Sequence, residues 1–385
     1  MSGKRTGRIV VMHLAARCPL AGVIWQLLHH LIGFRRLGFE VYYIEDNSDQ
    51  WLYDPYINDF TADPARNVGL LANALNAYGF KQDWAFFFDH AGQQHYGMER
   101  RRALELLRDA DAVINLCVAT LPRDELLRTR CLIYLETDPS DNAIRDIDLI
   151  SAHKLHFTYG YNIGAADCIL PSGNIRWNRT RPPVLLDEWR PGSGPAEPMA
   201  FTTVGVWQSE GHDIQIGGDT YYWSKHLNFR KLLDVPRRAA QPIELATDLE
   251  SGPDYQQAVA GGFKLVPAIP VSLNIKSYRQ YISASRGEFT AAKDLYVRTR
   301  SGWFSDRSAC YLAAGRPVIT QRTGFEKFIP TGTGLVGFDD ADEAVEAIRL
   351  VNADYARHAR VARELACEYF DALKVLDQIA QTAGL

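Results

Sequence analysis

The stretch from Ser285 to Glu326 reads SRGEFTAAKDLYVRTRSGWFSDRSACYLAAGRPVITQRTGFE, and its second half predicts one repeat of an open α/β sheet. Ser305 or Asp306 can cap a helix whose apolar residues recur at helical spacing. Gly315 then supplies a left-handed stop, and the β-branched pair Val318–Ile319 begins a short buried strand. A helix, a tight turn and a buried strand in this order are typical of a parallel α/β sheet.

The start of this predicted helix carries groups that suit a diphosphate. Free backbone N–H groups, the hydroxyls of Ser305 and Ser308 and the guanidinium of Arg307 lie at the positive end of the helix dipole. Lys293, twelve residues before Ser305, is far enough upstream to reach the same pocket from the preceding element. We expect Arg307→Ala or Lys293→Ala to weaken diphosphate binding about tenfold or more. We expect little change in folding stability, because an exposed arginine contributes little to it. The alternative is an ordinary capped helix with a solvated arginine.

The overall composition is that of a globular protein long enough for two domains. The chain has 385 residues, of which 46% are hydrophobic and 23% are charged. Its net charge of −4 argues against nucleic acid as the main partner. The six cysteines have no CxxC spacing, so we expect neither a disulfide framework nor a zinc site, and a reducing cytoplasm fits. The apolar run behind the basic N-terminus is too short to span a membrane.

The N-terminal part predicts a βαβ unit. The apolar run Arg8–Leu14 suits a central parallel strand, residues 23–37 place apolar side chains at helical spacing, and Val41–Ile44 forms the next strand. The runs DAVINLCVA, CLIYLETDP and KLHFTYG predict further buried strands. Because the spacing of the glycines is not GxGxxG, a dinucleotide-binding dehydrogenase is disfavoured.

Polar and aromatic residues follow the second of these strands. Four residues lie where the carboxyl end of the strand should meet the ligand-binding edge of the sheet, namely Glu45, Asp46, Trp51 and Tyr53. They are candidates to face an acceptor molecule. A surface loop pinned by its aromatic residues is the alternative.

A general base cannot be identified from the sequence. The candidates after later apolar runs are Asp89, His90, His95 and Asp138. We rank His90 and Asp138 first, because both follow runs that should end at the same edge of the sheet.

A change of composition divides the chain. Between Asp187 and Pro198 the sequence becomes rich in proline, glycine and charge, and a fresh strand begins at Phe201. We therefore expect one domain over residues 1–190, a second over 199–360, and a C-terminal helical segment over 361–385.

The motifs GRPVI, TGFE, GTGLVGF and DDADEAVEAI follow one another after residue 314. In order and spacing they resemble the C-terminal half of GT-B glycosyltransferases of the family 1 and family 4 type. The similarity covers roughly Gly302 to Leu350 and continues more weakly in the N-terminal domain. It implies two Rossmann-like domains facing a central cleft, with the last helix crossing back to the first domain.

The resemblance also implies which residues would hold a nucleotide-sugar donor. In this sequence they are Gly205, Lys225, Lys293, Ser305, Asp306, Arg307, Ser308, Thr323, Gly324 and Glu326. On the acceptor side it implies Gly22, in the loop after the first strand, beside Trp51 and Tyr53. No DxD-like motif stands out at a strand end, so no metal and no further cofactor is expected.

The chain departs from the family 4 pattern at a pair of glutamates. Those two positions, eight residues apart, are Gly302 and Cys310 here. The retaining chemistry associated with that pair cannot be transferred.

Three functions remain open from the sequence. The first is a metal-independent glycosyltransferase that moves a sugar from a UDP- or GDP-type donor to an unidentified hydroxyl. The second is a nucleotide-sugar epimerase, and the third is a non-catalytic sugar-nucleotide or carbohydrate-binding protein on the same frame. Release of the nucleoside diphosphate in the presence of an acceptor would separate the transferase from the binding protein. A sugar of inverted stereochemistry still on the nucleotide would reveal the epimerase.

Overall fold

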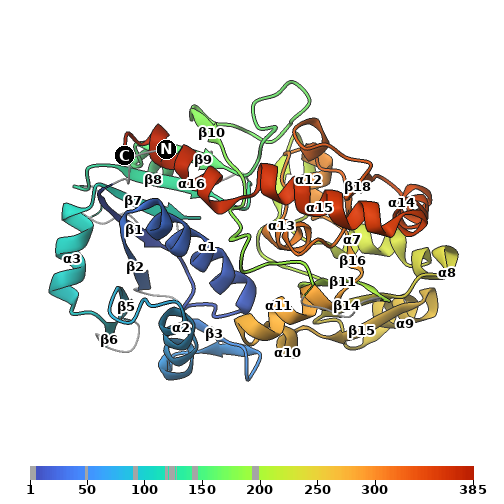
Figure 1. The fold of residues 1–385 in the computed structure, drawn as a ribbon, viewed down its shortest axis with the longest axis horizontal. Coiled ribbons are helices and arrows are strands. Elements are labelled where there is room, and N and C mark those ends of the chain that lie inside the picture. The colour runs from blue at the N-terminus through green and yellow to red at the C-terminus, as the bar shows by residue number, and fades with distance from the viewer. Residues whose placement is uncertain are drawn as a thin grey trace.

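The computed structural model describes residues 6–47, 51–89, 94–117, 120, 126, 128–140, 146–192 and 199–385. Within these ranges the chain forms two separate parallel sheets, each flanked by helices (Figure 1). The first sheet is built from the N-terminal half of the chain and the second from the C-terminal half. The predicted α/β class is confirmed.

The first sheet has the strand order β10-β9-β8-β7-β1-β2-β5-β6. Its pairs are parallel except that β6 runs antiparallel to β5. The strands are β1 (Arg8–Met12), β2 (Glu40–Asn47), β5 (Trp84–Phe88), β6 (Gln94–Gly97), β7 (Ala112–Leu116), β8 (Leu132–Glu136), β9 (Leu155–Thr158) and β10 (Trp177–Arg179).

Helix α1 (Ala21–Leu37) connects the neighbouring strands β1 and β2 of this sheet. It ends at Gly38, whose φ of 107° is the left-handed conformation that glycine adopts without strain. The predicted βαβ unit is confirmed. The other elements of this half are β3 (Leu52–Asp54), which pairs with β4 (Asp59–Thr61) in a small hairpin, α2 (Ala65–Ala77), α3 (Arg100–Asp109) and α6 (Ile147–Ser151).

The second sheet has the order β15-β14-β11-β16-β17-β18, and all its pairs are parallel. The strands are β11 (Phe201–Val204), β14 (Ile243–Thr247), β15 (Phe263–Pro267), β16 (Gly287–Thr290), β17 (Val318–Gln321) and β18 (Leu335–Phe338). The helices are α7 (His226–Phe229), η1 (Arg230–Leu232), α8 (Val235–Ala239), α9 (Gly252–Gly261), α10 (Ala268–Ser272), α11 (Ile275–Ala284), α12 (Asp294–Thr299), α13 (Asp306–Ala313), η2 (Phe325–Lys327) and α14 (Ala341–Ala353). A hairpin of β12 (Ile214–Ile216) and β13 (Asp219–Tyr221) lies outside the sheet.

The unit predicted from the quoted stretch is present. Ser305 is the N-cap residue of α13, Gly315 has a φ of 67°, and β17 begins at Val318. Because β11 and β16 are the central strands of this sheet, α13 starts beside the edge where both strands end.

The end of the chain runs from the second half to the first. Helix α15 (Tyr355–Tyr369) packs against α13, and α16 (Ala372–Thr382) packs against α1 (Figure 1). The fit against α1 is close, since a Cβ placed on Gly33 would lie 2.4 Å from Leu376 Cδ1.

A second connection joins the halves beside α12. Ile169 N donates to Thr299 O at 3.2 Å, and Asn162 N donates to Ser301 O at 3.1 Å. Residues 193–198 of the expected domain boundary lie outside the described residues, so the boundaries stay a prediction. None of the described helices combines the length and apolarity that crossing a membrane requires.

Candidate functional site

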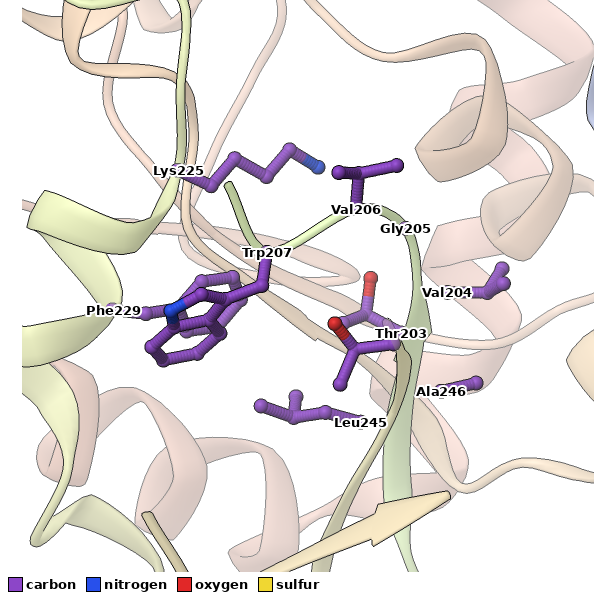
Figure 2. A pocket seen from close by; sticks show the side chains of 10 residues that line it. Thr203, Val204, Gly205, Val206, Trp207, Lys225, Phe229, Leu245 and Ala246 are labelled. Atoms are coloured by element: carbon purple, nitrogen blue, oxygen red, sulfur yellow. The ribbon is translucent and has the colours of Figure 1, made fainter. Parts of the chain in front are cut away.

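Two small cavities lie at the carboxyl ends of the central strands of the second sheet, and Lys225 lines both. The first is enclosed by β11, β14 and the start of α7. Figure 2 shows the Lys225 ammonium pointing toward Val206 and Gly205, the residues that follow β11. The second cavity is lined by Thr290, Ser305, Arg307 and Thr323, among others. Five of the residues expected to bind a donor therefore border one edge of the sheet, namely Gly205, Lys225, Ser305, Arg307 and Thr323.

Lys225 is the basic side chain shared by both cavities, and it has no carboxylate partner in the described part of the chain. Its ammonium forms no ion pair or hydrogen bond with any residue in the described part of the chain. Burial, followed by the positive charge of Arg307, holds the pKa of Lys225 well below its usual range, and Glu288 only partly offsets this. A Cβ placed on Gly205 would be 3.7 Å from Lys225 Nζ and 3.6 Å from Arg307 Nη1. Two cations thus converge on the backbone of Gly205, an arrangement that favours an anion.

Arg307 does not present its guanidinium to solvent at the helix start, as the sequence suggested. Its side chain turns back to the sheet, where Nε donates to Glu288 Oε1 at 2.6 Å and Nη1 donates to Val204 O at 3.0 Å. Arg307 is 11% exposed and Glu288 is fully buried. The premise of an exposed arginine is therefore wrong, and we expect the loss of Arg307 to destabilise the fold, because it would leave a buried carboxylate without its cationic partner.

The remaining groups at the start of α13 are mostly engaged by the protein. Asp306 Oδ1 accepts from Arg307 N at 2.8 Å, and Oδ2 accepts from Gln26 Nε2 of α1 at 3.4 Å. Burial, and then the charge of Asp138, raises the pKa of Asp306. Ser308 is 1% exposed and does not line the cavity. Its side chain is therefore not accessible to a donor molecule in this structure.

Lys293 faces the first half of the chain rather than the start of α13. Its Nζ lies 3.5 Å from Asp138 Oδ1 and 3.4 Å from the centre of the Trp223 ring. Burial lowers the pKa of Lys293, and Asp138 opposes this shift. The charge of Lys293 is still felt at Lys225, whose pKa it lowers.

Asp138 is the carboxylate that the first half contributes to this region. It follows β8, and its Oδ1 accepts a hydrogen bond from the Tyr296 hydroxyl at 2.6 Å. The side chain is 43% exposed, and its charge raises the pKa of Lys225. A carboxylate from one half and a free ammonium from the other thus lie in one electrostatic cluster. His90, the other favoured base, lies outside the described residues.

The polar groups of the TGFE segment, residues 323–326, form hydrogen bonds with nearby protein groups. Thr323 Oγ1 donates to Trp303 O at 2.6 Å, and Gly324, with a φ of 101°, donates its N–H to Glu326 Oε2 at 3.0 Å. Glu326 Oε1 also accepts from Arg300 Nη2 at 3.3 Å. Of these three motif residues, only Thr323 lines a cavity, so Gly324 and Glu326 act on the shape of the loop.

Two expectations on the acceptor side need correction. Gly22 lies in the first turn of α1 and not in a loop, and a Cβ there would meet the Tyr278 hydroxyl at 3.5 Å. Glu45 is 1% exposed and cannot face an acceptor. Its carboxylate instead accepts from the backbone N–H groups of Ala16 at 2.6 Å and Arg17 at 2.8 Å, and burial raises the pKa of Glu45 to about 7.

Trp51 and Tyr53 lie just before and within β3 of the β3–β4 hairpin. Tyr53 donates its hydroxyl to Asn58 Oδ1 at 2.6 Å, and Trp51 beside it is 52% exposed. Burial raises the pKa of Tyr53, and the charge of Asp248, just beyond β14, adds to this shift. The position of this hairpin is compatible with the expected acceptor side.

The two further candidates for the general base, His95 and Asp89, lie away from the cavities around Lys225. His95 lies within β6 at the antiparallel edge of the first sheet, with its ring 5.4 Å from that of Phe87. Asp89 lies 3.7 Å from Arg100. Neither lines the two cavities around Lys225.

The two positions at which the family 4 pattern has glutamates are closely packed in this structure. Gly302 has a φ of 78°, and a Cβ there would lie 2.4 Å from Asn162 N of the first half. Cys310 is buried with its Sγ 3.7 Å from His29 Nε2 of α1. Both positions are contacts between the halves, and a glutamate side chain would not fit at residue 302.

Two residues that contact the charged groups of this site could not be recognised from the sequence. Glu288 is one acidic residue in the strand GEFT, and Tyr296 is one aromatic residue in a short helix. Only their tertiary contacts single them out. Among the described residues, no group of three or more His, Cys, Asp or Glu side chains could hold a metal ion.

No family model matches the sequence, and no curated protein matches it. Solved structures do match over nearly the whole chain. An alpha-glucosyltransferase in complex with UDP-glucose and DNA containing an abasic site has a TM-score of 0.60 and 13% identity, covering 99% of this chain and 100% of that one. AviGT4, a glycosyltransferase involved in avilamycin A biosynthesis, has a TM-score of 0.58 and 10% identity, covering 98% and 97%. HepE from Anabaena, in complex with UDP and glucose, has a TM-score of 0.55 and 13% identity, covering 98% and 99%. The chain has the GT-B fold of these glycosyltransferases.

Proposed function

We propose that this protein is a glycosyltransferase that takes a sugar from a nucleoside-diphosphate donor and transfers it to an acceptor hydroxyl. The observation that carries the proposal is the unpaired ammonium of Lys225 beside Gly205, at the carboxyl ends of the central strands. A diphosphate would supply the counter-ion that the described residues do not. Similar structures that contain UDP and UDP-glucose support a donor of this kind.

The residues present suit a leaving-group role without a metal. Lys225 would bind the diphosphate directly, and Ser305 and Thr323 border the same edge. Arg307 would contribute positive charge from the side of the sheet, since its Nη1 lies near the Gly205 backbone while Nε remains bound to Glu288. Positive charge fixed in this way stabilises the diphosphate as the bond to the sugar breaks.

Asp138 is the proposed base on the acceptor side. In this step the acceptor hydroxyl gives its proton to the carboxylate, its oxygen bonds to the anomeric carbon, and the bond from that carbon to the diphosphate oxygen breaks. Trp51 and Tyr53 would border the acceptor. A nucleic-acid acceptor fits less well, given the net charge of −4. We also propose a cytoplasmic location, which the six unpaired cysteines support.

Calorimetric titration with UDP, GDP and their sugars tests the donor site. Lys225→Met should weaken binding of the preferred nucleotide about tenfold or more, because a charge-assisted contact to phosphate is worth roughly 1.5–3 kcal/mol. Lys276→Met, at an exposed lysine on α11, is the matched control and should bind normally. Equal affinity in both variants would move the donor away from Lys225.

A non-catalytic binding protein is the second candidate. The contacts that occupy Gly302 and Cys310, where the family pattern has glutamates, favour it. It would bind the nucleotide-sugar but release no nucleoside diphosphate, with or without acceptors.

A further inference from the structure

We infer that Tyr296 and Lys293 are positioning residues that orient the Asp138 carboxylate only when the two halves of the protein are together. The inference rests on the proposed function, since it treats Asp138 as the acceptor-side base. It concerns the regulation of that same site.

The contact between Asp138 and α12 joins the two halves of the chain. Asp138 follows β8 of the first sheet, whereas Tyr296 lies within α12 and Lys293 is the N-cap residue of that helix. The Tyr296 hydroxyl donates to Asp138 Oδ1 at 2.6 Å, and Lys293 Nζ lies 3.5 Å from the same oxygen. In the described part of the chain no hydrogen bond is formed by Oδ2. One oxygen is therefore fixed and the other is left for a proton.

The two partners of Asp138 are closely packed, although the carboxylate itself is not enclosed. Tyr296 is fully buried, with its ring stacked on Trp303 at 4.4 Å, and the Lys293 ammonium lies 3.4 Å from the Trp223 ring centre. Asp138, by contrast, is 43% exposed. A half-exposed carboxylate gains little stability from an ion pair, so orientation is the main consequence of these contacts.

The hydrogen bond has a defined direction. Burial, and then the charge of Asp138, raises the pKa of Tyr296 well above its usual range, so the phenol keeps its proton and remains the donor. Next to Asp138, Trp303 Nε1 donates to Thr137 O at 2.8 Å, so the backbone that carries Asp138 is also held by the second half. If the halves separate, both the backbone and the carboxylate of residue 138 lose their supports.

Tyr296→Phe removes the hydroxyl and leaves the ring stack in place, so it is the sharpest test. Tyr311→Phe is the matched control, because Tyr311 is also fully buried in the second half and its hydroxyl forms a short hydrogen bond, 2.6 Å from Thr202 Oγ1, away from Asp138. Crystal structures, melting temperatures, nucleotide affinity and the rate of nucleoside-diphosphate release are measured for both variants.

We expect the Asp138 side chain to leave its single position in Tyr296→Phe and to keep it in Tyr311→Phe. We expect kcat to fall about tenfold or more only in Tyr296→Phe, with donor affinity within twofold of the unmodified protein and the two melting temperatures similar. An unmoved Asp138 carboxylate in Tyr296→Phe overturns the inference, as does an unchanged kcat. If the unmodified protein releases no nucleoside diphosphate, the proposed function fails, and the crystal structures still decide whether Tyr296 positions Asp138.

Discussion

Arg307 Nε lies 2.6 Å from Glu288 Oε1, beneath the surface of the second sheet at the point where its central strands end. The pair places the guanidinium near Gly205 and Lys225 while it holds α13 to β16. One residue therefore contributes to both the charge of the site and the stability of the sheet.

Loss of Arg307 should be costly for folding. Arg307→Ala leaves the carboxylate of Glu288, which is fully buried, without its partner. We expect the free energy of unfolding to fall by about 3–5 kcal/mol, measured by urea denaturation. The double variant Arg307→Met, Glu288→Leu removes both charges and should recover much of this loss. A loss below about 1 kcal/mol in Arg307→Ala would show that the pair behaves like a surface salt bridge.

Lys225→Met should have the opposite effect on the unliganded protein. The ammonium is held near Arg307 and Lys293 with no counter-ion in the described chain, so its removal relieves repulsion. We expect an unchanged or higher melting temperature without ligand. A nucleoside diphosphate that raises the melting temperature of the unmodified protein should raise that of Lys225→Met much less. A clear drop in melting temperature without ligand would mean that Lys225 stabilises the fold.

The sequence predicts the local structure around Arg307 but not the direction of its side chain. The position of α13, its N-cap residue Ser305 and the strand after Gly315 were predictable, because stops and β-branched runs act over a few residues. The Ser305 side chain, however, forms no capping hydrogen bond. The direction of the Arg307 side chain was not predictable, because it depends on Glu288, nineteen residues earlier on strand β16. Gly302 likewise looks like an ordinary loop glycine until Asn162 is placed against it.

Four buried histidines should make the protein sensitive to mild acid. Burial lowers the pKa of His13, His30 and His153 to about 4 and that of His29 to about 3. In the unfolded chain a histidine has a pKa near 6.5. The unfolded state therefore binds more protons below that pH, and stability falls as the pH drops from 6.5 toward 4.

Each of these histidines should cost roughly 2 kcal/mol by pH 5. Glu45 opposes the trend, because its raised pKa of about 7 makes the folded state the better proton binder between pH 7 and 4.5. The four histidines outweigh this single carboxyl group. Denaturation curves at pH 7.5, 6 and 5 measure the slope, and His30→Met should make it shallower. A stability that stays level down to pH 5 would contradict the buried, neutral state of these rings.

Gly302 should tolerate no side chain, and this prediction bears on the missing glutamates. A Cβ at residue 302 would lie 2.4 Å from Asn162 N and 2.8 Å from Asn162 Cβ, at a φ of 78°. Gly164 is the matched control, since its φ of 83° is nearly the same and a Cβ there would meet nothing within 4 Å. Gly164→Ala should therefore cost only the backbone strain, about 1–2 kcal/mol. Gly302→Ala should cost a further 1–3 kcal/mol in the free energy of unfolding, because the contact between the halves must open to admit the methyl group. If the two variants lose equal stability, the halves are not closed on Gly302, and the absence of a glutamate at that position has another cause.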